Sequence, residues 1–348
     1  MARKNAIGLD IGASSIKLVQ LKETKRGFQL ERLAMKPLPT EAIVEGSLMG
    51  QSAVVNTIRD LISTHKVKVK DAALSISGMS VIIKKISLPS MDADELEEQI
   101  NWEAAQYIPY DVTEVHMDYQ LLQRRPDQGQ MDVLLVAAKR DMVDEYVHAV
   151  RTAGLSPVVV EVDCFSVQNA FENAYGFNPG ETIALIDIGA TTVNMSIVSN
   201  GITMFTRDIN MGGNLYTEEI RKQLGVSYDE AENLKVDQDP TDASRPELRR
   251  IMERVSDTLA GEIQRSLDFY LNNAAESQFS KLYLSGGAAR EPSLSQAIER
   301  RARVKVELTD PFRNLQIDRK LFGEELLAEM RPISVVAFGL ALRRALDK

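Results

Sequence analysis

The chain has 348 residues, 44% of them hydrophobic, which is enough to bury the cores of two or three domains. Its formal net charge of −9 argues against nucleic acid as the main partner, because binding a phosphate backbone requires a basic face. The single cysteine, Cys164, excludes an internal disulfide, and the three histidines lack metal-ligand spacing. The apolar runs are too short to span a bilayer, and the first residues lead directly into a predicted strand. We therefore expect a cytoplasmic protein without a signal peptide.

The first predicted strand, residues 6–9, ends in a turn that combines an acid, a glycine and two hydroxyls. The turn contains Asp10, Gly12, Ser14 and Ser15. A second strand-like run follows at 16–21, so the unit is predicted to be a hairpin. Glycine lets the backbone fold sharply and brings N–H groups close to a ligand, as in loops that hold phosphate. We interpret the turn as a phosphate loop; the alternative is an ordinary hairpin turn.

Beyond this hairpin, a strand at 28–35, a helix at 51–65 and a strand at 72–77 predict a mixed sheet with a packed helix. Between about 80 and 160 the predicted order is strand, helix, strand, strand, helix, strand, which is the ferredoxin-like pattern. We interpret this region as a small subdomain inserted into the first half. Its last strand is expected at 157–162.

The acid–glycine–hydroxyl turn recurs between predicted strands at 183–186 and 193–198. The second copy contains Asp187, Gly189, Thr191 and Thr192. A carboxylate repels phosphate unless a cation lies between them, and hydrated Mg²⁺ takes one or two carboxylates together with phosphate oxygens. The sequence therefore predicts two facing turns that bind a polyphosphate with Mg²⁺, which Asp10 and Asp187 hold through water.

Small residues mark the rest of the second half and the end of the chain. Gly212 and Gly213 open a predicted helix at about 214–224, where a helix N-terminus can approach an anion. Another glycine pair, in the segment Ser285–Ala288, follows a predicted strand at 282–284. A final helix is expected at 333–346, and the family resemblance described next implies that its Ala337, Gly339 and Ala341 let it cross another helix closely.

Two α/β halves with these turns and glycine pairs resemble the actin, Hsp70 and sugar-kinase superfamily of ATP-binding proteins. The insert in the first half resembles FtsA, and the segment Ile100–Asp111 looks most like the PilM family of type IV pilus assembly proteins. The resemblance implies an α/β, actin-like ATPase fold with an inserted ferredoxin-like, 1C-type subdomain. The expected first half comprises 1–80, 161–180 and 331–348, the insert 81–160, and the second half 181–330.

The resemblance implies ATP and Mg²⁺ as ligands and assigns nucleotide binding to Asp10, Gly12, Ser14, Ser15, Lys17, Asp187, Gly189, Thr191, Thr192, Gly212, Gly213, Glu262, Arg265, Ser285, Gly286, Gly287 and Ala288. Glu262 and Arg265 are expected at the adenosine; the alternative is a solvated ion pair. Asp163 or Glu161 is expected to hold the attacking water or the hydrated metal. Strand alternation places both acids on one face, so the sequence leaves this choice open.

Trp102 lies off the apolar face of the helix expected at 92–108, which indicates a second packing contact or a binding surface. The resemblance implies that the N-terminal cytoplasmic tail of the membrane protein PilN binds as an extended peptide in a groove between this insert and the first half. The residues assigned to that contact are Trp102, Tyr107, Ile108, Pro109 and Tyr110. Through PilN the chain is expected to connect to PilO and other pilus components at the inner membrane, with self-association possible and without inserting into the membrane itself.

The leading hypothesis is therefore an ATP-binding assembly adaptor with at most slow ATPase activity. One alternative is a small-molecule kinase of the same superfamily, with Asp163 or Glu161 as the base for a substrate hydroxyl. The apolar-faced insert argues against it, because kinases of this superfamily keep the cleft open to a polar sugar pocket. A filament-forming, FtsA-like protein is a further alternative.

Overall fold

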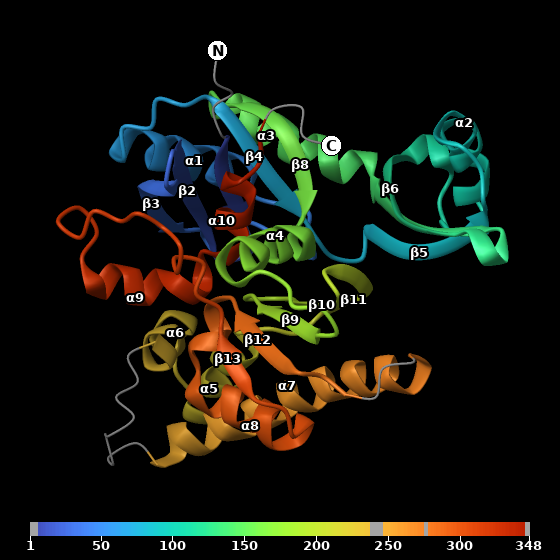
Figure 1. Ribbon diagram of the computed structural model, residues 1–348. Helices are drawn as coiled ribbons and strands as arrows, with labels where there is room; N and C mark the ends of the chain where they lie inside the picture. Colours follow the sequence, from blue (N-terminus) through green and yellow to red (C-terminus); the bar gives the residue numbers. More distant parts are fainter. Residues whose placement is uncertain (1–5, 237–245, 275–277, 345–348) are drawn as a thin grey trace.

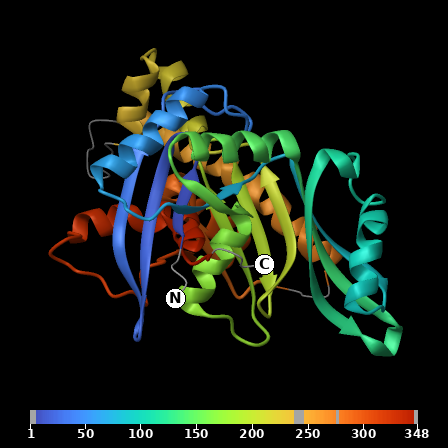
Figure 2. The ribbon, with the colours of Figure 1, turned by 90° about the horizontal axis from the view of Figure 1, so that it is seen from above.

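The computed structural model describes residues 6–236, 246–274 and 278–344. Figure 1 shows two α/β bodies, one above the other, and a smaller lobe beside the upper body. We call the upper body the first half and the lower body the second half. Figure 2, seen from above, shows the lobe standing apart at one edge of the molecule. The ends of the expected domains at residues 1–5 and 345–348 lie outside the described residues.

The first half is built on a five-stranded sheet that begins with the predicted hairpin. In spatial order its strands are β3 (Gly27–Pro37), β2 (Ser15–Thr24), β1 (Ile7–Ile11), β4 (Asp71–Ile76) and β8 (Ser156–Val162). One face is covered by α1 (Gln51–Thr64) and α3 (Arg140–Thr152), whose apolar stripes share a core with β1 and β4. The other face is covered by α4 (Asp163–Tyr175) and α10 (Val335–Ala341).

The second half repeats this sheet. Its strands, again in spatial order, are β11 (Ile202–Ile209), β10 (Val193–Ser199), β9 (Thr182–Ile188), β12 (Lys281–Ser285) and β13 (Val306–Leu308). In both sheets the strand before the turn pairs antiparallel with the next strand and parallel with a later one. The outer face carries α5 (Asn214–Leu224), α6 (Tyr228–Val236), α7 (Pro246–Asn273) and α8 (Pro292–Ala302). The duplication predicted from the two turns is thus present in the sheets.

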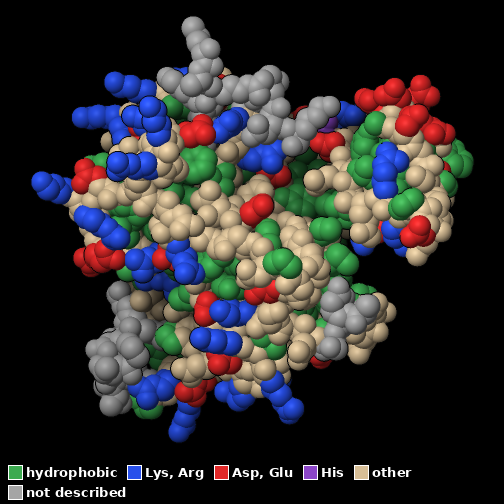
Figure 3. Space-filling model, viewed as in Figure 1, with side chains coloured by type: hydrophobic (Ala, Val, Ile, Leu, Met, Phe, Trp, Pro, Cys, Tyr) green, Lys and Arg blue, Asp and Glu red, His purple; other side chains and the backbone are tan. Residues whose placement is uncertain are grey.

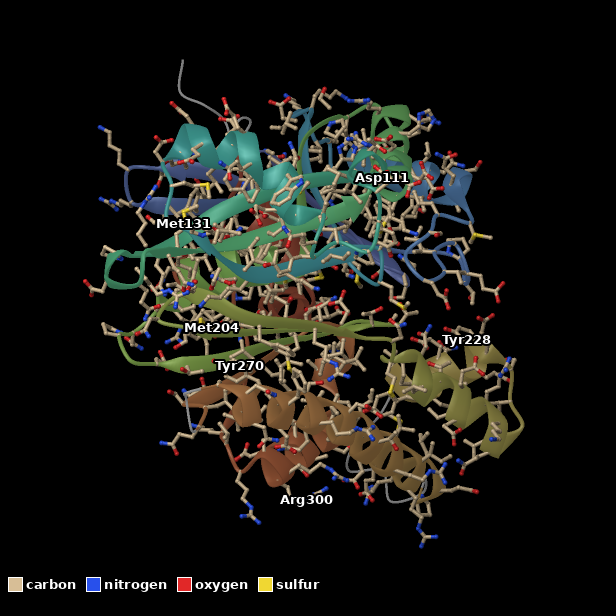
Figure 4. The ribbon with its side chains drawn as sticks, turned by 90° about the vertical axis from the view of Figure 1, so that its right-hand side faces the viewer. Asp111, Met131, Met204, Tyr228, Tyr270 and Arg300 are labelled. Atoms are coloured by element: carbon tan, nitrogen blue, oxygen red, sulfur yellow. The ribbon has the colours of Figure 1, made fainter. Side chains whose placement is uncertain are left out.

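The lobe has a sheet and a core of its own. Its strands are β5 (Val81–Pro89), β7 (Gln130–Lys139) and β6 (Val115–Arg125), with the helix α2 (Ala93–Ala104) and the short turns η1 (Val112–Glu114) and η2 (Pro126–Gln128). Side chains such as Leu96, Ile100 and Val133 form a core separate from those of the two halves. Figure 4 looks onto this lobe, with β11 and its Met204 below the lobe and Tyr270 of α7 lower still.

The expectation that residues 157–162 close the lobe's sheet is wrong. This strand, β8, pairs in parallel with β4 in the first half, and the preceding helix α3 buries Val143 and Tyr146 in the first core. The element order of the insert matches the sequence pattern, but local order does not determine which sheet edge a strand joins. We therefore place the end of the lobe at Lys139, where β7 ends.

Several elements near the C-terminus were absent from the sequence prediction. Between the second glycine pair and the end of the chain lie η3 (Gly287–Arg290), α8, β13 and α9 (Glu324–Ile333). The single helix expected at 333–346 is instead α10, which follows α9 after a break at Ser334. Pro332, near the end of α9, removes a backbone donor and favours this break. Residues 345 and 346 of the expected helix lie outside the described residues.

The close helix crossing predicted at the end of the chain is confirmed. A Cβ atom at Gly339 of α10 would lie 1.8 Å from the carbonyl oxygen of Ser166 in α4. On the β1 side, a Cβ at Gly8 would lie 1.9 Å from the carbonyl oxygen of Ala337. Both α4 and α10 belong to a core that also includes Ile183 and Leu185 of the second half. The two glycines therefore set how closely the connection between the halves packs.

Replacing Gly339 tests this packing. Gly339→Ala should lower the midpoint of thermal unfolding by several degrees, because the methyl group forces α4 and α10 apart at a cost of about 1–3 kcal/mol. Gly261→Ala in α7 is the matched control, since a Cβ there meets no heavy atom within 4 Å and alanine favours the helix. Equal midpoints for the two variants in differential scanning fluorimetry would contradict the close crossing.

Candidate functional site

A cavity of about 570 Å³ lies between the two halves and the lobe. The first half supplies the turn after β1, the segment 75–78 and the loop 43–49. The second half supplies the turn after β9. The lobe and its borders contribute Met79, Ser80, Tyr110 and Lys139. All three parts of the molecule therefore meet at one site.

The two predicted turns have matching geometry at this cavity. Asp10 pairs across its hairpin with Lys17, and Asp187 pairs in the equivalent position with Asn194. The Gly12 amide donates to the carbonyl of Ser15 (3.2 Å), and the Gly189 amide donates to that of Thr192 (2.9 Å). The glycine amides therefore close the turns, and the groups facing the cavity come from the residues around them. Ser14, Thr191 and Thr192 line the cavity, whereas Ser15 is buried in β2.

Three aspartates contribute negative charge to the same cavity. They are Asp10, Asp163 and Asp187. The ammonium of Lys17 lies 3.1 Å from Asp10, and the Ser285 hydroxyl donates to Asp187 (2.7 Å). Burial raises the pKa of Asp163 to about 7, and the charge of Asp10 adds to the effect. Burial also raises the pKa of Asp187 to about 6, although the Ser285 hydrogen bond opposes this shift. The aspartates are thus only partly compensated by protein groups.

The structure distinguishes the two acids that the sequence left open. β8 ends at Val162 and α4 begins at Asp163, so strand alternation does not extend to Asp163. Asp163 lines the cavity, whereas Glu161 does not. Glu161 remains in the strand, accepts a hydrogen bond from Asn169 and lies 3.3 Å from the guanidinium of Arg343. Geometry favours Asp163 as the residue that faces a ligand.

The predicted glycine pairs pack behind the second turn. A Cβ at Gly212 would lie 2.6 Å from the carbonyl oxygen of Gly189, and one at Gly286 would lie 2.4 Å from that of Ile188. Gly286 also has φ = +89°, which L side chains rarely adopt. The amides of Gly213 and Asn214, at the start of α5, donate to the carbonyls of Gly189 and Ala190. These contacts fix the second turn. The two segments behind it, 212–213 and 285–288, are called the glycine wall below, and none of their residues is among those that line the cavity.

Glu262 and Arg265 are not among the residues that line the cavity. They pair with each other on α7, and the Arg265 side chain is 67% exposed. On α7, the hydroxyl of Ser256 hydrogen-bonds Tyr216 in the first turn of α5 at 2.8 Å. Glu262 lies six residues farther along the helix, a rise of about 9 Å.

A charged pair on α6 lies closer to the glycine wall. Glu232 and Lys235 contact each other and both hydrogen-bond the hydroxyl of Thr217, one turn into α5. Thr217 is fully buried, and α5 begins directly after Gly213, so the pair borders the region behind the second turn. This pair is not among the residues predicted from the sequence. Its signal was an acid and a lysine three residues apart on the short helix that follows the glycine-opened helix.

The lobe residues predicted to bind a partner have different environments. Trp102 is 71% exposed, so it does not pack against the first half. Ile108 is buried in the lobe's core, with Tyr107 and Tyr110 partly buried against it, and Pro109 is exposed. Tyr110 also lines the cavity. In Figure 4 the neighbouring Asp111 and Met131 lie at opposite ends of the lobe, and Asp111 is at the end where β7 meets α3.

A short chain of hydrogen bonds connects the cavity to the start of the lobe. The side-chain amide of Asn194, which lines the cavity, donates to Asp208 of β11 (2.8 Å). The other carboxylate oxygen of Asp208 accepts from the amide of Gly78 (2.7 Å), three residues before β5. The second half thus holds the point at which the chain enters the lobe.

The described residues include no helix that is both long and apolar enough to cross a membrane. In the same part of the chain, no three His, Cys, Asp or Glu side chains lie close enough to ligate a metal ion directly. Oxygen donors are nevertheless present at the cavity as carboxylates and hydroxyls, the donors that Mg²⁺ prefers, and Mg²⁺ usually keeps several waters. The donor set therefore fits a hydrated magnesium ion.

Comparisons with known proteins agree with this architecture. The family described as "Type IV pilus assembly protein PilM" matches residues 8–345. The solved structure of a PilM–PilN type IV pilus biogenesis complex is similar over 99% of this chain and 100% of that chain, with a TM-score of 0.87 and 29% identity.

More distant similarity extends to two further proteins. EutJ, an ethanolamine utilization protein of Carboxydothermus hydrogenoformans, matches 98% of this chain and 90% of its own with a TM-score of 0.60 and 16% identity. The cell division protein FtsA of Bacillus subtilis (strain 168) is 22% identical over 253 residues, 66% of this chain and 57% of FtsA. The match thus covers little more than half of FtsA. The predicted actin-like fold with an inserted lobe is confirmed.

The raised pKa of Asp163 predicts a stability gain when its charge is removed. Because its pKa is about 7 in the folded chain and near 4 in the unfolded chain, the folded state binds the proton more tightly. Wild-type stability therefore falls as pH rises from about 4 to 7, and Asp163→Asn avoids this loss. In the ligand-free protein, the free energy of unfolding of the variant minus that of wild type should be on the order of 1–3 kcal/mol larger at pH 8 than at pH 4.

Urea unfolding of both proteins between pH 4 and 8, with a metal chelator present, measures this difference. Asp268→Asn, an exposed acid on α7, is the control and should show no such pH-dependent gain. A wild-type-to-variant difference that stays constant from pH 4 to 8 would contradict the buried carboxyl environment.

Proposed function

Because the chain belongs to the PilM family of type IV pilus assembly proteins, we propose that it is an ATP-binding adaptor of the pilus assembly complex at the inner membrane. Its direct partner in this proposal is the N-terminal cytoplasmic tail of PilN, through which it connects to PilO and other pilus components. The protein is then cytoplasmic and held at the membrane by that partner. Self-association stays a prediction, and the small-molecule kinase alternative is not favoured.

The observation that carries nucleotide binding is the pair of matching turns on one cavity. Gly12 and Gly189 close equivalent hairpin turns, and hydroxyls from both turns line the space between them. The cavity, at about 570 Å³, is within the usual size range of ligand pockets. A polyphosphate held between the turns would contact both halves and so stabilise one arrangement of the halves over others.

The uncompensated aspartates support a metal-bound nucleotide. Asp10 and Asp187 would hold Mg²⁺ through water, and Asp163 is the third carboxylate in reach of the same space. When bound, Mg²⁺ supplies positive charge that offsets the phosphates and the aspartates. Lys17 adds a fixed cation beside Asp10. Asp163 is placed to orient a water molecule, so slow hydrolysis is compatible with the site.

The nucleoside is expected on the side of the glycine pairs. At Gly212 and Gly286 the backbone packs directly against the second turn, so this wall consists of backbone rather than side chains. Glu232 and Lys235 contact Thr217, one turn after the Gly212–Gly213 pair, whereas Glu262 and Arg265 pair with each other on α7. We therefore add Glu232 and Lys235 as candidates for contact with ribose and adenine.

The lobe is the proposed partner-binding element. The structural similarity to a PilM–PilN complex over the whole chain supports PilN as the partner. On α2 the exposed indole of Trp102 offers apolar contact area, and Glu95, Glu97 and Glu98 are exposed on the same helix. Figure 3 shows acidic side chains gathered on this end of the lobe. Such a surface suits a peptide that combines apolar anchors with basic residues.

Nucleotide and partner sites are connected through the contact between β11 and the lobe. Asn194 at the cavity, Asp208 and the Gly78 amide form one hydrogen-bonded series. A ligand that moves the second half relative to the first acts on this series directly. The proposed coupling requires only that the nucleotide bind the closed arrangement more tightly than the open one.

Removing the acid of the second turn should abolish nucleotide binding. Asp187→Ala should weaken Mg²⁺-ATP binding more than about 100-fold in isothermal titration calorimetry, because a carboxylate proposed to hold the metal's water is lost. Asp268→Ala on α7, far from the cavity lining, should bind as wild type does. Unchanged affinity in Asp187→Ala would remove the second turn from the proposed site.

The partner surface can be tested with a fluorescently labelled peptide that carries the N-terminal tail of PilN from the same organism. Trp102→Ala should weaken binding by about tenfold in fluorescence anisotropy, because an exposed aromatic anchor is lost without disturbing the core. Phe269→Ala, a 54% exposed aromatic residue on α7, is the matched control. If Trp102→Ala binds as tightly as Phe269→Ala does, the tail binds elsewhere.

A further inference from the structure

Lys139 stands at the junction between the lobe and the first half. It is the last residue of β7, its amide donates to the carbonyl of Ser80, and α3 begins at the next residue. α3 is anchored in the first core by Val143 and Tyr146, so the backbone at this junction is well fixed. The Lys139 side chain is exposed and lines the cavity together with Tyr110.

Among the described residues, Lys139 is the lysine of the cavity lining that contacts no carboxylate. The charged residues lining the cavity are Asp10, Lys17, Glu45, Lys139, Asp163 and Asp187. Lys17 is paired with Asp10. Within residues 6–236, 246–274 and 278–344, Lys139 forms no ion pair, and its ammonium lies 4.4 Å from the centroid of the Tyr110 ring. Its charge is therefore available to an anion that enters the cavity.

The position of Lys139 selects one part of a nucleotide. The glycine wall expected to contact the nucleoside lies behind the second turn, in the second half. Lys139 and Tyr110 belong to the lobe side of the cavity, with Ser80 and Met79. With the nucleoside at the glycine wall, as proposed above, the part of the nucleotide that reaches the lobe side is the end of its phosphate chain. A diphosphate is shorter at that end by one phosphoryl group.

We propose that Lys139 binds the terminal phosphate of a nucleoside triphosphate and releases the Tyr110 ring when it does so. The inference rests on the nucleotide site proposed above and assigns a residue of the lobe to that site. A charge-assisted hydrogen bond to phosphate is stronger than a cation–π contact at an exposed site. The Lys139 ammonium therefore leaves the Tyr110 ring and binds the terminal phosphate of the triphosphate. A diphosphate leaves Lys139 on the ring.

Release of Tyr110 changes the segment that leads to the partner surface. Tyr110 follows Tyr107 and Ile108, which pack on the lobe's core next to α2. The segment beyond it stays anchored, because Arg140 donates to the carbonyl of Thr113 (2.8 Å) and Asp111 caps η1. The terminal phosphate thus changes the contacts of the Tyr110 side chain, while the backbone stays fixed before it at Ile108 and after it at Asp111. The partner peptide should therefore bind the triphosphate and diphosphate forms with different affinities.

Calorimetry with Mg²⁺-ATP and Mg²⁺-ADP separates this role from general binding. Lys139→Gln should weaken ATP by about tenfold and leave ADP within about twofold, because only the terminal phosphate loses its contact. Tyr110→Leu should strengthen ATP by a few-fold, since Lys139 no longer has to leave an aromatic ring. Lys84→Gln, an exposed lysine on β5 of the same lobe, is the matched control and should change neither ligand.

The outcomes are distinguishable. Unchanged ATP affinity in Lys139→Gln, or an equal loss for ATP and ADP, overturns the terminal-phosphate role while leaving the nucleotide site in place. Wild-type protein that binds neither nucleotide overturns the proposed function itself. With the labelled PilN tail, wild type should bind differently in ATP and ADP, and Lys139→Gln should reduce that difference. A difference that persists unchanged in the variant also contradicts the proposed role of Lys139.

Discussion

The structure depends on a charge imbalance that the fold maintains between its two halves. Asp10, Asp163 and Asp187 share one cavity, and Lys17 is paired with the first of them. Backbone contacts at Gly212 and Gly286 prevent the second turn from moving away, and the close crossing at Gly339 fixes the connection between the halves. Carboxylates held together at an energetic cost are typical of binding and catalytic sites. A cation and an anionic ligand would relieve that cost.

The sequence predicted the parts of this arrangement that local pattern determines. The acid–glycine–hydroxyl turns predicted the duplication, and the small residues around Gly339 predicted a close crossing, because both depend on residue type at fixed spacing. Nonlocal choices were beyond its reach. The strand at 157–162 has the same pattern whether it pairs with β4 or closes the lobe.

Two further differences concern position rather than type. Alternation could not separate Glu161 from Asp163, since the change from strand to helix falls between them. The assignment of Glu262 and Arg265 to the adenosine did not include the height at which α7 passes the glycine wall. Tertiary contacts place Ser256 at that height and bring Glu232 and Lys235 of α6 to the first turn of α5. A site assembled from several elements requires the packing between them.

The lobe joins an exposed surface on α2 to the lining of the cavity. This connection suits the adaptor role proposed above. The central claim is that a magnesium nucleotide lies between the twin turns. A crystal structure grown with Mg²⁺ and a non-hydrolysable ATP analogue tests it most directly. The account predicts phosphate oxygens between the turns at Gly12 and Gly189, with the metal's waters near Asp10 and Asp187. A cavity without ligand density at saturating analogue would contradict it.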